Sequence, residues 1–232
     1  MSIAENVATV LENIRIAVTE AGRKPGEVVL CAATKMNDSA RVREAIAAGV
    51  TVCGENRVQE LVQKQAEGAY EGAKVHFIGH LQTNKVRQVV GHVDLIQSVD
   101  REKLLFAIAD EAAKQGIVQD ILLQVNIGYE PQKGGFFPEQ VPQILEMLVK
   151  LPSVRVRGLM AIPPICQNPG ENHKFFQKMH EIGVDIRRKK YDNVCMDIMS
   201  MGMSDDYADA IACGSTMVRV GTAIFGARHY AN

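Results

Sequence analysis

The sequence lacks several features that would assign a protein to a broad class at once. Its 232 residues include no tryptophan, and its net charge of −1 gives no support for binding nucleic acid or anionic membranes through bulk electrostatics. It has no run of about 18 apolar residues to span a bilayer, and its first residues lack the basic and apolar regions of a signal peptide. We therefore expect a cytoplasmic protein with neither membrane nor nucleic acid as partner.

Paired cysteine motifs are also absent. The five cysteines are widely spaced, with no Cys-x-x-Cys pair: Cys31, Cys53, Cys166, Cys195 and Cys213. This pattern is typical of free thiols in a reducing compartment, not of disulfides or a zinc site. The histidines are scattered, so we expect no metal site.

What the sequence does contain is a series of short apolar runs separated by amphipathic segments. Several runs lack polar alternation, as expected of strands buried on both faces. The eight runs are Val28–Lys35, Thr51–Glu55, Val75–His80, Leu95–Val99, Ile121–Asn126, Val156–Ile162, Met196–Met201 and Met217–Phe225.

The segments between these runs have readable helix ends. Asp100 and Ser204 are candidate N-caps, Ser39 and Pro138 stand at other helix starts, and Gly116 stands where a helix should end. An additional helix, residues 3–21, precedes the first strand. Eight strands with intervening helices in this length predict a single (β/α)8 barrel of the α/β class over residues 1–232, with a doubly wound open sheet as the alternative.

Lys35 closes the first apolar run and is the most informative residue. In a barrel, the active site lies at the carboxyl ends of the strands, so this ammonium group would point into the mouth. Desolvation there disfavours the charged form and gives a nucleophilic amine that can form a Schiff base. The alternative is an ordinary strand-end lysine that extends into solvent.

Small residues follow the seventh and eighth strands, where barrels often bind phosphate through backbone N–H groups. Ser200 and Gly202 follow one strand, and Gly221 and Thr222 follow the other. Gly221 and Thr222 taken alone also fit a plain turn. A Schiff-base lysine facing a phosphate site suggests pyridoxal 5′-phosphate (PLP).

Arg219 should point to the same face of its strand as Gly221, two residues later. A buried arginine needs a partner, which is either an acid such as Asp197 or Glu55, or a ligand. If that ligand is the pyridine nitrogen, the permanently protonated guanidinium leaves this nitrogen unprotonated, and the cofactor becomes a poor electron sink.

Five motifs together resemble the pyridoxal phosphate homeostasis proteins, which belong to the alanine racemase-like, fold-type III group. The motifs are Ala33–Lys35, Gly54–Glu60, His76–Lys85, Ser200–Ser204 and Val218–Gly226. By this resemblance, Lys35 matches the Schiff-base lysine, Asn56 the asparagine beside the cofactor, and Arg219 the arginine at the ring nitrogen. Ser200, Gly202, Gly221 and Thr222 match the phosphate-binding positions, and His80 is expected to border the ring.

One loop departs from the family pattern. Asn126–Phe136 keeps Lys133 but lacks the small residue and serine that are more usual before the final glycine, and it carries an extra glycine. We expect a flexible loop at Gly134 and Gly135.

The resemblance favours a PLP carrier or regulator in vitamin B6 and amino-acid homeostasis, without substantial catalysis. Racemases of this group use a second base, a tyrosine from a C-terminal β-domain that we do not expect here, and Tyr129, Tyr191 and Tyr207 fall in loops or helices. The alternatives are a PLP-dependent amino-acid racemase completed by a partner, and a barrel that binds another phosphorylated ligand. We expect a monomer, with a dimer as the alternative, and PLP-dependent enzymes as recipients.

Overall fold

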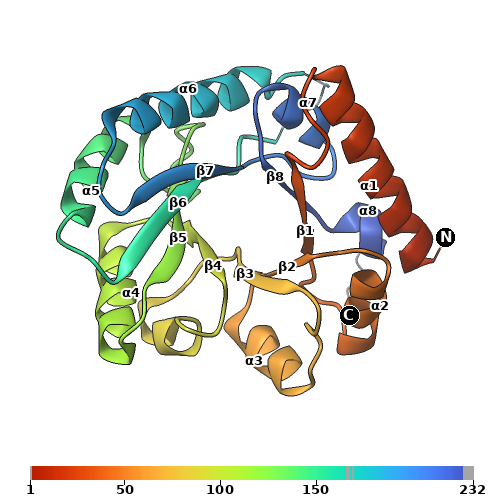
Figure 1. Cartoon of the computed structure of the whole chain (residues 1–232), viewed down its shortest axis with the longest axis horizontal. Helices are drawn as coiled ribbons and strands as arrows, with labels where there is room; N and C mark the ends of the chain where they lie inside the picture. The colour runs from red at the N-terminus through yellow and green to blue at the C-terminus, as the bar shows by residue number, and fades with distance from the viewer. Residues whose placement is uncertain (1, 166–167, 169, 227–232) are drawn as a thin grey trace.

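Eight parallel strands close into a barrel in the computed structural model, which describes residues 2–165, 168 and 170–226 (Figure 1). Each strand pairs in parallel with the next, and the eighth pairs with the first. The (β/α)8 barrel is therefore confirmed over the open sheet. The strands are β1 (Val29–Ala33), β2 (Val52–Glu55), β3 (Lys74–Phe77), β4 (Leu95–Val99), β5 (Gln119–Val125), β6 (Val154–Ala161), β7 (Val194–Ser200) and β8 (Met217–Val220).

Helices surround the barrel and bury their apolar stripes against the outer faces of the strands. The α-helices are α1 (Ile3–Glu20), α2 (Ser39–Ala47), α3 (Val58–Ala66), α4 (Glu102–Gln115), α5 (Val141–Leu148), α6 (His173–Lys189), α7 (Tyr207–Ala212) and α8 (Thr222–Phe225). Two short 3₁₀ helices, η1 (Thr83–Gln88) and η2 (Pro138–Gln140), complete the described elements.

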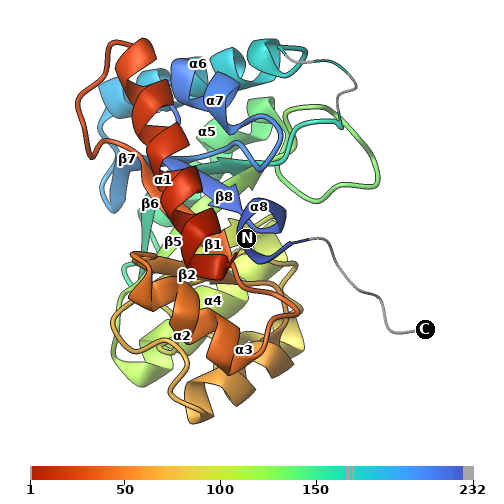
Figure 2. The same ribbon diagram turned by 90° about the vertical axis from the view of Figure 1, so that its right-hand side faces the viewer.

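The additional N-terminal helix is α1, which packs on the outside of the barrel against α2, α7 and α8 (Figure 2). Ser2 and Glu5 form a capping box at its start, which satisfies two backbone N–H groups reciprocally. Asn6 also donates from its side-chain amide to the Ile224 carbonyl at 2.9 Å. This helix therefore supports α8, which follows the last strand.

Several expected element ends differ from the structure. Asp38, not Ser39, caps α2, because its carboxylate accepts a hydrogen bond from the Arg41 N–H. Asp100 caps no helix, since its carboxylate contacts Arg101 and His80 instead. Residues 204–206 form a turn before α7, and the second half of the last apolar run is the helix α8.

The parallel arrangement brings the carboxyl ends of all eight strands to one end of the barrel, so the residues that follow them share a mouth. Within the described residues, no group of three or more His, Cys, Asp or Glu side chains could hold a metal ion. No helix in this part of the chain is both long enough and apolar enough to cross a bilayer.

Candidate functional site

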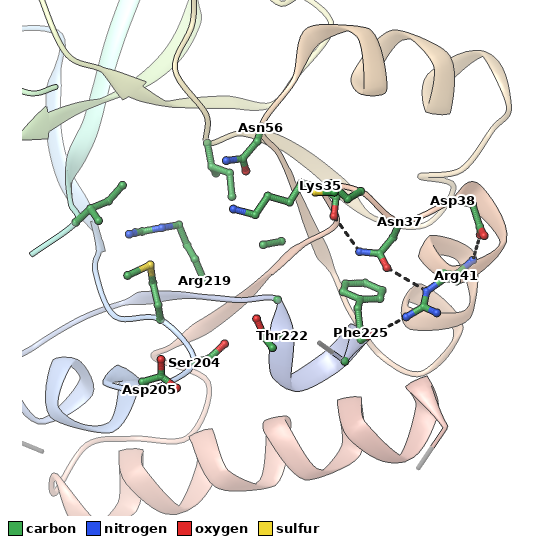
Figure 3. Close-up of a pocket in the computed structure, with 17 residues that line it drawn as sticks. Lys35, Asn37, Asp38, Arg41, Asn56, Ser204, Asp205, Arg219, Thr222 and Phe225 are labelled. Atoms are coloured by element: carbon green, nitrogen blue, oxygen red, sulfur yellow. Dashed lines mark hydrogen bonds between the residues drawn. The ribbon is translucent and has the colours of Figure 1, made fainter. Parts of the chain in front are cut away.

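A cavity of about 540 Å³ opens at the carboxyl ends of the strands (Figure 3). Five of the eight residues that the sequence predicts for the site line it: Lys35, Asn56, Arg219, Gly221 and Thr222. The other lining residues are Ala33, Met36, Asn37, Asp38, Arg41, Ile78, Ile162, Met203, Ser204, Asp205, Phe225 and Gly226. None of these residues is a tyrosine, histidine or cysteine.

Lys35 lies in the turn after β1, and its half-buried side chain points into the cavity toward Arg219 (Figure 3). The turn places Met36 at φ 60°, in the left-handed region that residues with a side chain seldom adopt. Asn37 stabilises the turn, because its backbone N–H donates to the Thr34 carbonyl and its side-chain amide to the Lys35 carbonyl at 3.0 Å. The direction of the Lys35 side chain is thus set by a held backbone.

Asn56 follows β2 and contributes an unusual atom to the wall. Its Oδ1 is buried and has no hydrogen-bond partner among the described residues. Buried acceptors are nearly always paired, so an unpaired one on a cavity wall indicates a donor that a ligand supplies. Gly79 packs directly on the Asn56 backbone: a Cβ at Gly79 would lie 2.2 Å from the Asn56 carbonyl oxygen, and only glycine permits this approach.

Arg219 is a buried cation whose hydrogen bonds, among the residues that the structure describes, all go to neutral oxygens. One of its terminal nitrogens donates to the carbonyl and hydroxyl of Ser200 at 2.8 and 2.7 Å, and the other to the Ala161 carbonyl at 2.9 Å. Burial lowers the pKa of the guanidinium to about 10, which still leaves it charged at neutral pH. The expected acidic partners are engaged elsewhere, Asp197 with Arg157 and Glu55 with Lys64.

A chain of hydrogen bonds continues from Arg219 through the barrel interior. The Ser200 hydroxyl donates to Gln97 Oε1 at 2.6 Å, and Gln97 Nε2 lies 2.9 Å from His76 Nδ1. Because an amide nitrogen donates, Nδ1 must accept, which requires a neutral imidazole. Desolvation lowers the pKa of His76 to about 4, in agreement with this state.

Ser200 and Gly202, both expected at the phosphate, lie outside the cavity lining. The buried Ser200 hydroxyl is used in the chain that holds Arg219, because the side chain points into the barrel. Gly202 has φ 94°, and a Cβ there would lie 2.6 Å from that of Ala210, so this glycine allows the chain to approach α7 closely. Ser204, which sequence reasoning assigned to a helix cap, lines the cavity instead.

His80 is also outside the lining, because its side chain turns toward β4. Nδ1 lies 3.0 Å from an Asp100 carboxylate oxygen, and the side chain is 63% exposed. The strand that was expected to run to His80 ends at Phe77. The following residues therefore form a loop, and the alternation that would have aimed His80 inward does not extend that far.

Gly221 and Thr222 lie at the start of α8 and line the cavity. Figure 3 shows Thr222 beside it. The Gly221 position is tight, since a Cβ there would lie 3.3 Å from the Cβ and the carbonyl oxygen of Ala33. The Thr222 side chain lies on the same side of the cavity as Ser204 in Figure 3. Two hydroxyl groups and a close backbone approach are therefore available on one wall.

Sequence reasoning missed the outer rim next to Lys35. Arg41 of α2 lies with its guanidinium 5.9 Å from the centre of the Phe225 ring, and it donates to the Phe225 carbonyl and, at 3.0 Å, to Asn37 Oδ1. Asp38 joins this rim as the cap of α2. Nothing in the sequence indicated that Phe225 lies on this rim, because it was assigned to a strand. The Asn37-Asp38 pair before a helix could have indicated the rim, since Asp and Asn are common helix caps.

The loop expected to be flexible is tied to the barrel by several hydrogen bonds. The Asn126 side-chain amide donates to the carbonyls of Glu130 and Lys133, and Lys133 Nζ donates to the Pro163 carbonyl at 2.7 Å. Gly134 packs on Asp100, where a Cβ would lie 2.6 Å from a carboxylate oxygen. The glycines therefore serve close packing.

Comparisons with known proteins identify relatives of this chain in sequence and in structure. The family model "Alanine racemase, N-terminal domain" matches residues 6–229. The chain is 42% identical over 230 residues to a protein of Aquifex aeolicus named pyridoxal phosphate homeostasis protein, covering 99% of this chain and 100% of that one. A protein of the same name from Pseudomonas aeruginosa is 42% identical over 229 residues, covering 99% and 97%.

Among solved structures, PipY of Synechococcus elongatus with PLP bound superimposes with a TM-score of 0.83. It is 34% identical, and the alignment covers 97% of this chain and 100% of PipY.

Proposed function

The chain belongs to the pyridoxal phosphate homeostasis proteins, within the alanine racemase N-terminal domain family, and we propose that it holds PLP in the cavity between Lys35 and Arg219. The observation that carries the proposal is the convergence of a lysine amine and a buried guanidinium, hydrogen-bonded to neutral oxygens, on one cavity whose wall includes the unpaired Asn56 Oδ1. This set of donors and acceptors suits a planar heterocycle that carries an aldehyde, a hydroxyl group and a phosphate.

Lys35 is the residue proposed to link the cofactor covalently. With PLP bound, the Lys35 amine would be the nucleophile that condenses with the cofactor aldehyde and releases one water molecule, and this linkage would hold the cofactor covalently. This condensation is redox-neutral and needs no further reactant. PLP bound in this way supplies an electron sink, whose strength depends on the protonation of its ring nitrogen.

Arg219 is proposed to donate a hydrogen bond to that ring nitrogen. Its three hydrogen bonds to Ser200 and Ala161 leave donors for a ligand, and these three acceptors are neutral. A cationic donor keeps the ring nitrogen unprotonated, and this weakens carbanion stabilisation. The arrangement favours retention of the cofactor over chemistry at an amino acid.

The phosphate is proposed to bind at Gly221, Thr222 and Ser204. The two hydroxyl groups donate to it, and the first N–H groups of a helix have no intrahelical acceptor. Ser200 is proposed to act through Arg219 and not at the phosphate. Gly202 has a packing role against α7.

We propose a carrier or regulatory role in vitamin B6 and amino-acid homeostasis, with PLP-dependent enzymes as recipients. Racemisation needs two bases on opposite faces of the substrate, and no tyrosine is among the described residues that line the cavity. The four described cysteines are free thiols, which supports a reducing compartment such as the cytoplasm. The alternative is a racemase that a partner completes.

The experiment is a spectroscopic titration of the purified protein with PLP. We expect an imine absorbance band that Lys35→Ala abolishes and that Lys103→Ala, at an exposed lysine of α4, leaves intact. A full band in Lys35→Ala would exclude Lys35 as the linking residue. The absence of any band in the wild-type protein would favour another phosphorylated ligand.

A coupled assay of D-alanine formed from L-alanine separates the carrier from the racemase. We expect formation close to background, because no tyrosine of the described residues lines the cavity as a second base and general acid–base catalysis typically contributes about 10²–10⁴-fold. Turnover near the enzyme median of about 10 s⁻¹ would establish the racemase instead.

A further inference from the structure

A cluster of buried charged residues lies behind the turn that carries Lys35, outside the cavity lining. Glu55, at the end of β2, is 0% exposed, and Lys64 of α3 is 4% exposed. Glu55 Oε1 accepts hydrogen bonds from Lys64 Nζ at 2.7 Å, from the Thr34 hydroxyl at 2.5 Å and from the Tyr70 hydroxyl at 3.0 Å. Burial and Glu55 raise the pKa of Tyr70, which therefore stays a donor.

The ammonium group of Lys64 connects this cluster to the backbone on both sides of Lys35. Besides Glu55, its Nζ donates to the Thr34 carbonyl at 2.8 Å and to Glu60 Oε2 at 3.4 Å. The same Glu60 oxygen accepts a hydrogen bond from the Met36 N–H at 2.7 Å. An ammonium has three N–H donors, and all three are used. One buried cation thus contacts the residue before Lys35 directly and the residue after it through Glu60.

The turn requires such support because Met36 has φ 60°. A residue with a side chain adopts this left-handed conformation only where its surroundings favour it over the ordinary regions. Without an acceptor for its N–H, Met36 would relax toward an ordinary conformation, and the Lys35 side chain would no longer point toward Arg219.

We propose that Glu55, Glu60 and Lys64, here called the Lys64 clamp, are positioning residues that aim the Lys35 amine at the aldehyde carbon of PLP. This inference rests on the proposed function and adds residues that touch neither the cofactor nor the cavity. A buried ion pair is weak evidence for stability, because desolvation offsets its attraction, whereas fixing one geometry is a role that such pairs do serve.

Glu60 offers the cleanest test, because its side chain is 20% exposed and its removal buries no unpaired charge. Glu60→Ala deletes the acceptor of the Met36 N–H, and Glu60→Gln keeps an oxygen there. Gln59→Ala, one position earlier on the same helix and exposed, is the matched control.

Two ligands separate aiming from general damage to the site. PLP carries the aldehyde that reacts with Lys35, and pyridoxine 5′-phosphate has the same ring and phosphate with an alcohol in its place. The clamp predicts that Glu60→Ala weakens PLP binding about tenfold or more, as for loss of a hydrogen bond to a charged acceptor, and changes pyridoxine 5′-phosphate binding by less than twofold. Glu60→Gln and Gln59→Ala should bind both ligands like the wild type.

Hydrogen exchange in the cofactor-free protein gives a second readout that is independent of PLP. Glu60→Ala should raise the exchange rate of the peptide that contains Met36 about tenfold or more, and the two other variants should not. Equal weakening of both ligands, or unchanged exchange, would refute the clamp. If the wild type forms no imine at all, the proposed function fails, while the exchange result still decides whether Glu60 holds the turn.

Discussion

Lys35 and Arg219 are held in opposite ways. The turn of Lys35 is supported from outside the barrel by charged groups, the Lys64 clamp between β2 and α3. Arg219 is supported from inside the barrel by neutral groups, in a chain through Ser200 and Gln97 to His76. No carboxylate of the described residues hydrogen-bonds to the Arg219 guanidinium.

This difference separates two tasks. The charged groups at Lys35 act on its backbone and leave the amine to point into the cavity. The neutral chain at Arg219 fixes the guanidinium directly without a hydrogen-bonded carboxylate, and under the proposed function a ring nitrogen would accept a hydrogen bond from it. A carboxylate hydrogen-bonded to Arg219 would compete for these donors.

The largest expected effect is the loss of stability when the Lys64 clamp is changed. Lys64→Met removes the cation and leaves Glu55 buried with two neutral donors, which should cost about 3–5 kcal/mol in the free energy of unfolding. Adding Glu55→Gln to Lys64→Met should recover much of this loss. Urea denaturation of the two variants measures both effects, and an equal loss in both would mean that charge is not the cause.

The neutral hydrogen-bond chain from Arg219 to His76 should make the stability of the protein depend on pH. The pKa of His76 is lowered to about 4 by burial, below the value of about 6.5 of an unfolded chain. The unfolded state then binds the proton first, so stability is full above pH about 6.5 and falls by about 3 kcal/mol down to pH about 4. His76→Gln should flatten this slope in urea denaturation at several pH values. A slope unchanged from that of the wild type would show that His76 does not titrate in this window.

Ligand binding should distinguish the role of the Thr222 hydroxyl from that of the Ser200 hydroxyl. Thr222→Ala should weaken PLP binding about tenfold or more, the loss of a hydrogen bond to a charged phosphate, and should not affect pyridoxal, which lacks the phosphate. Ser200→Ala should weaken both ligands alike, because it acts through Arg219. Titrations with both ligands provide the comparison. A loss confined to PLP in Ser200→Ala would place Ser200 at the phosphate.

The smallest effect is expected for Tyr70→Phe. This change removes one of three donors to Glu55 Oε1, and Lys64 and Thr34 remain, so the free energy of unfolding should fall by about 1 kcal/mol. PLP affinity should be unchanged within twofold. Denaturation combined with a PLP titration tests this, and a strong loss of affinity would mean that the Tyr70 hydroxyl is part of the positioning clamp.

The sequence was sufficient to predict the barrel and the residues that follow its strands directly. Lys35, Asn56, Arg219, Gly221 and Thr222 line the cavity because buried parallel strands place their carboxyl ends at one mouth.

The structure places Ser200 and His80, two of the predicted site residues, outside the cavity lining, and each of them has a second polar environment within reach. Ser200 points inward to Gln97 and not outward to the cavity, and His80 turns to Asp100 once β3 has ended. The Lys64 clamp could have been predicted from the sequence. Lys64 lies on the buried stripe of α3 with Val58 and Leu61, where a charged residue needs a partner.

Borohydride reduction followed by peptide mass spectrometry is the sharpest test of whether PLP is held on Lys35 opposite Arg219. Reduction fixes the linkage, so the modified lysine is identified together with the cofactor. We predict a single modified peptide that contains Lys35, and its loss in Lys35→Ala. A label on a different lysine, or no label after incubation with PLP, would contradict the account.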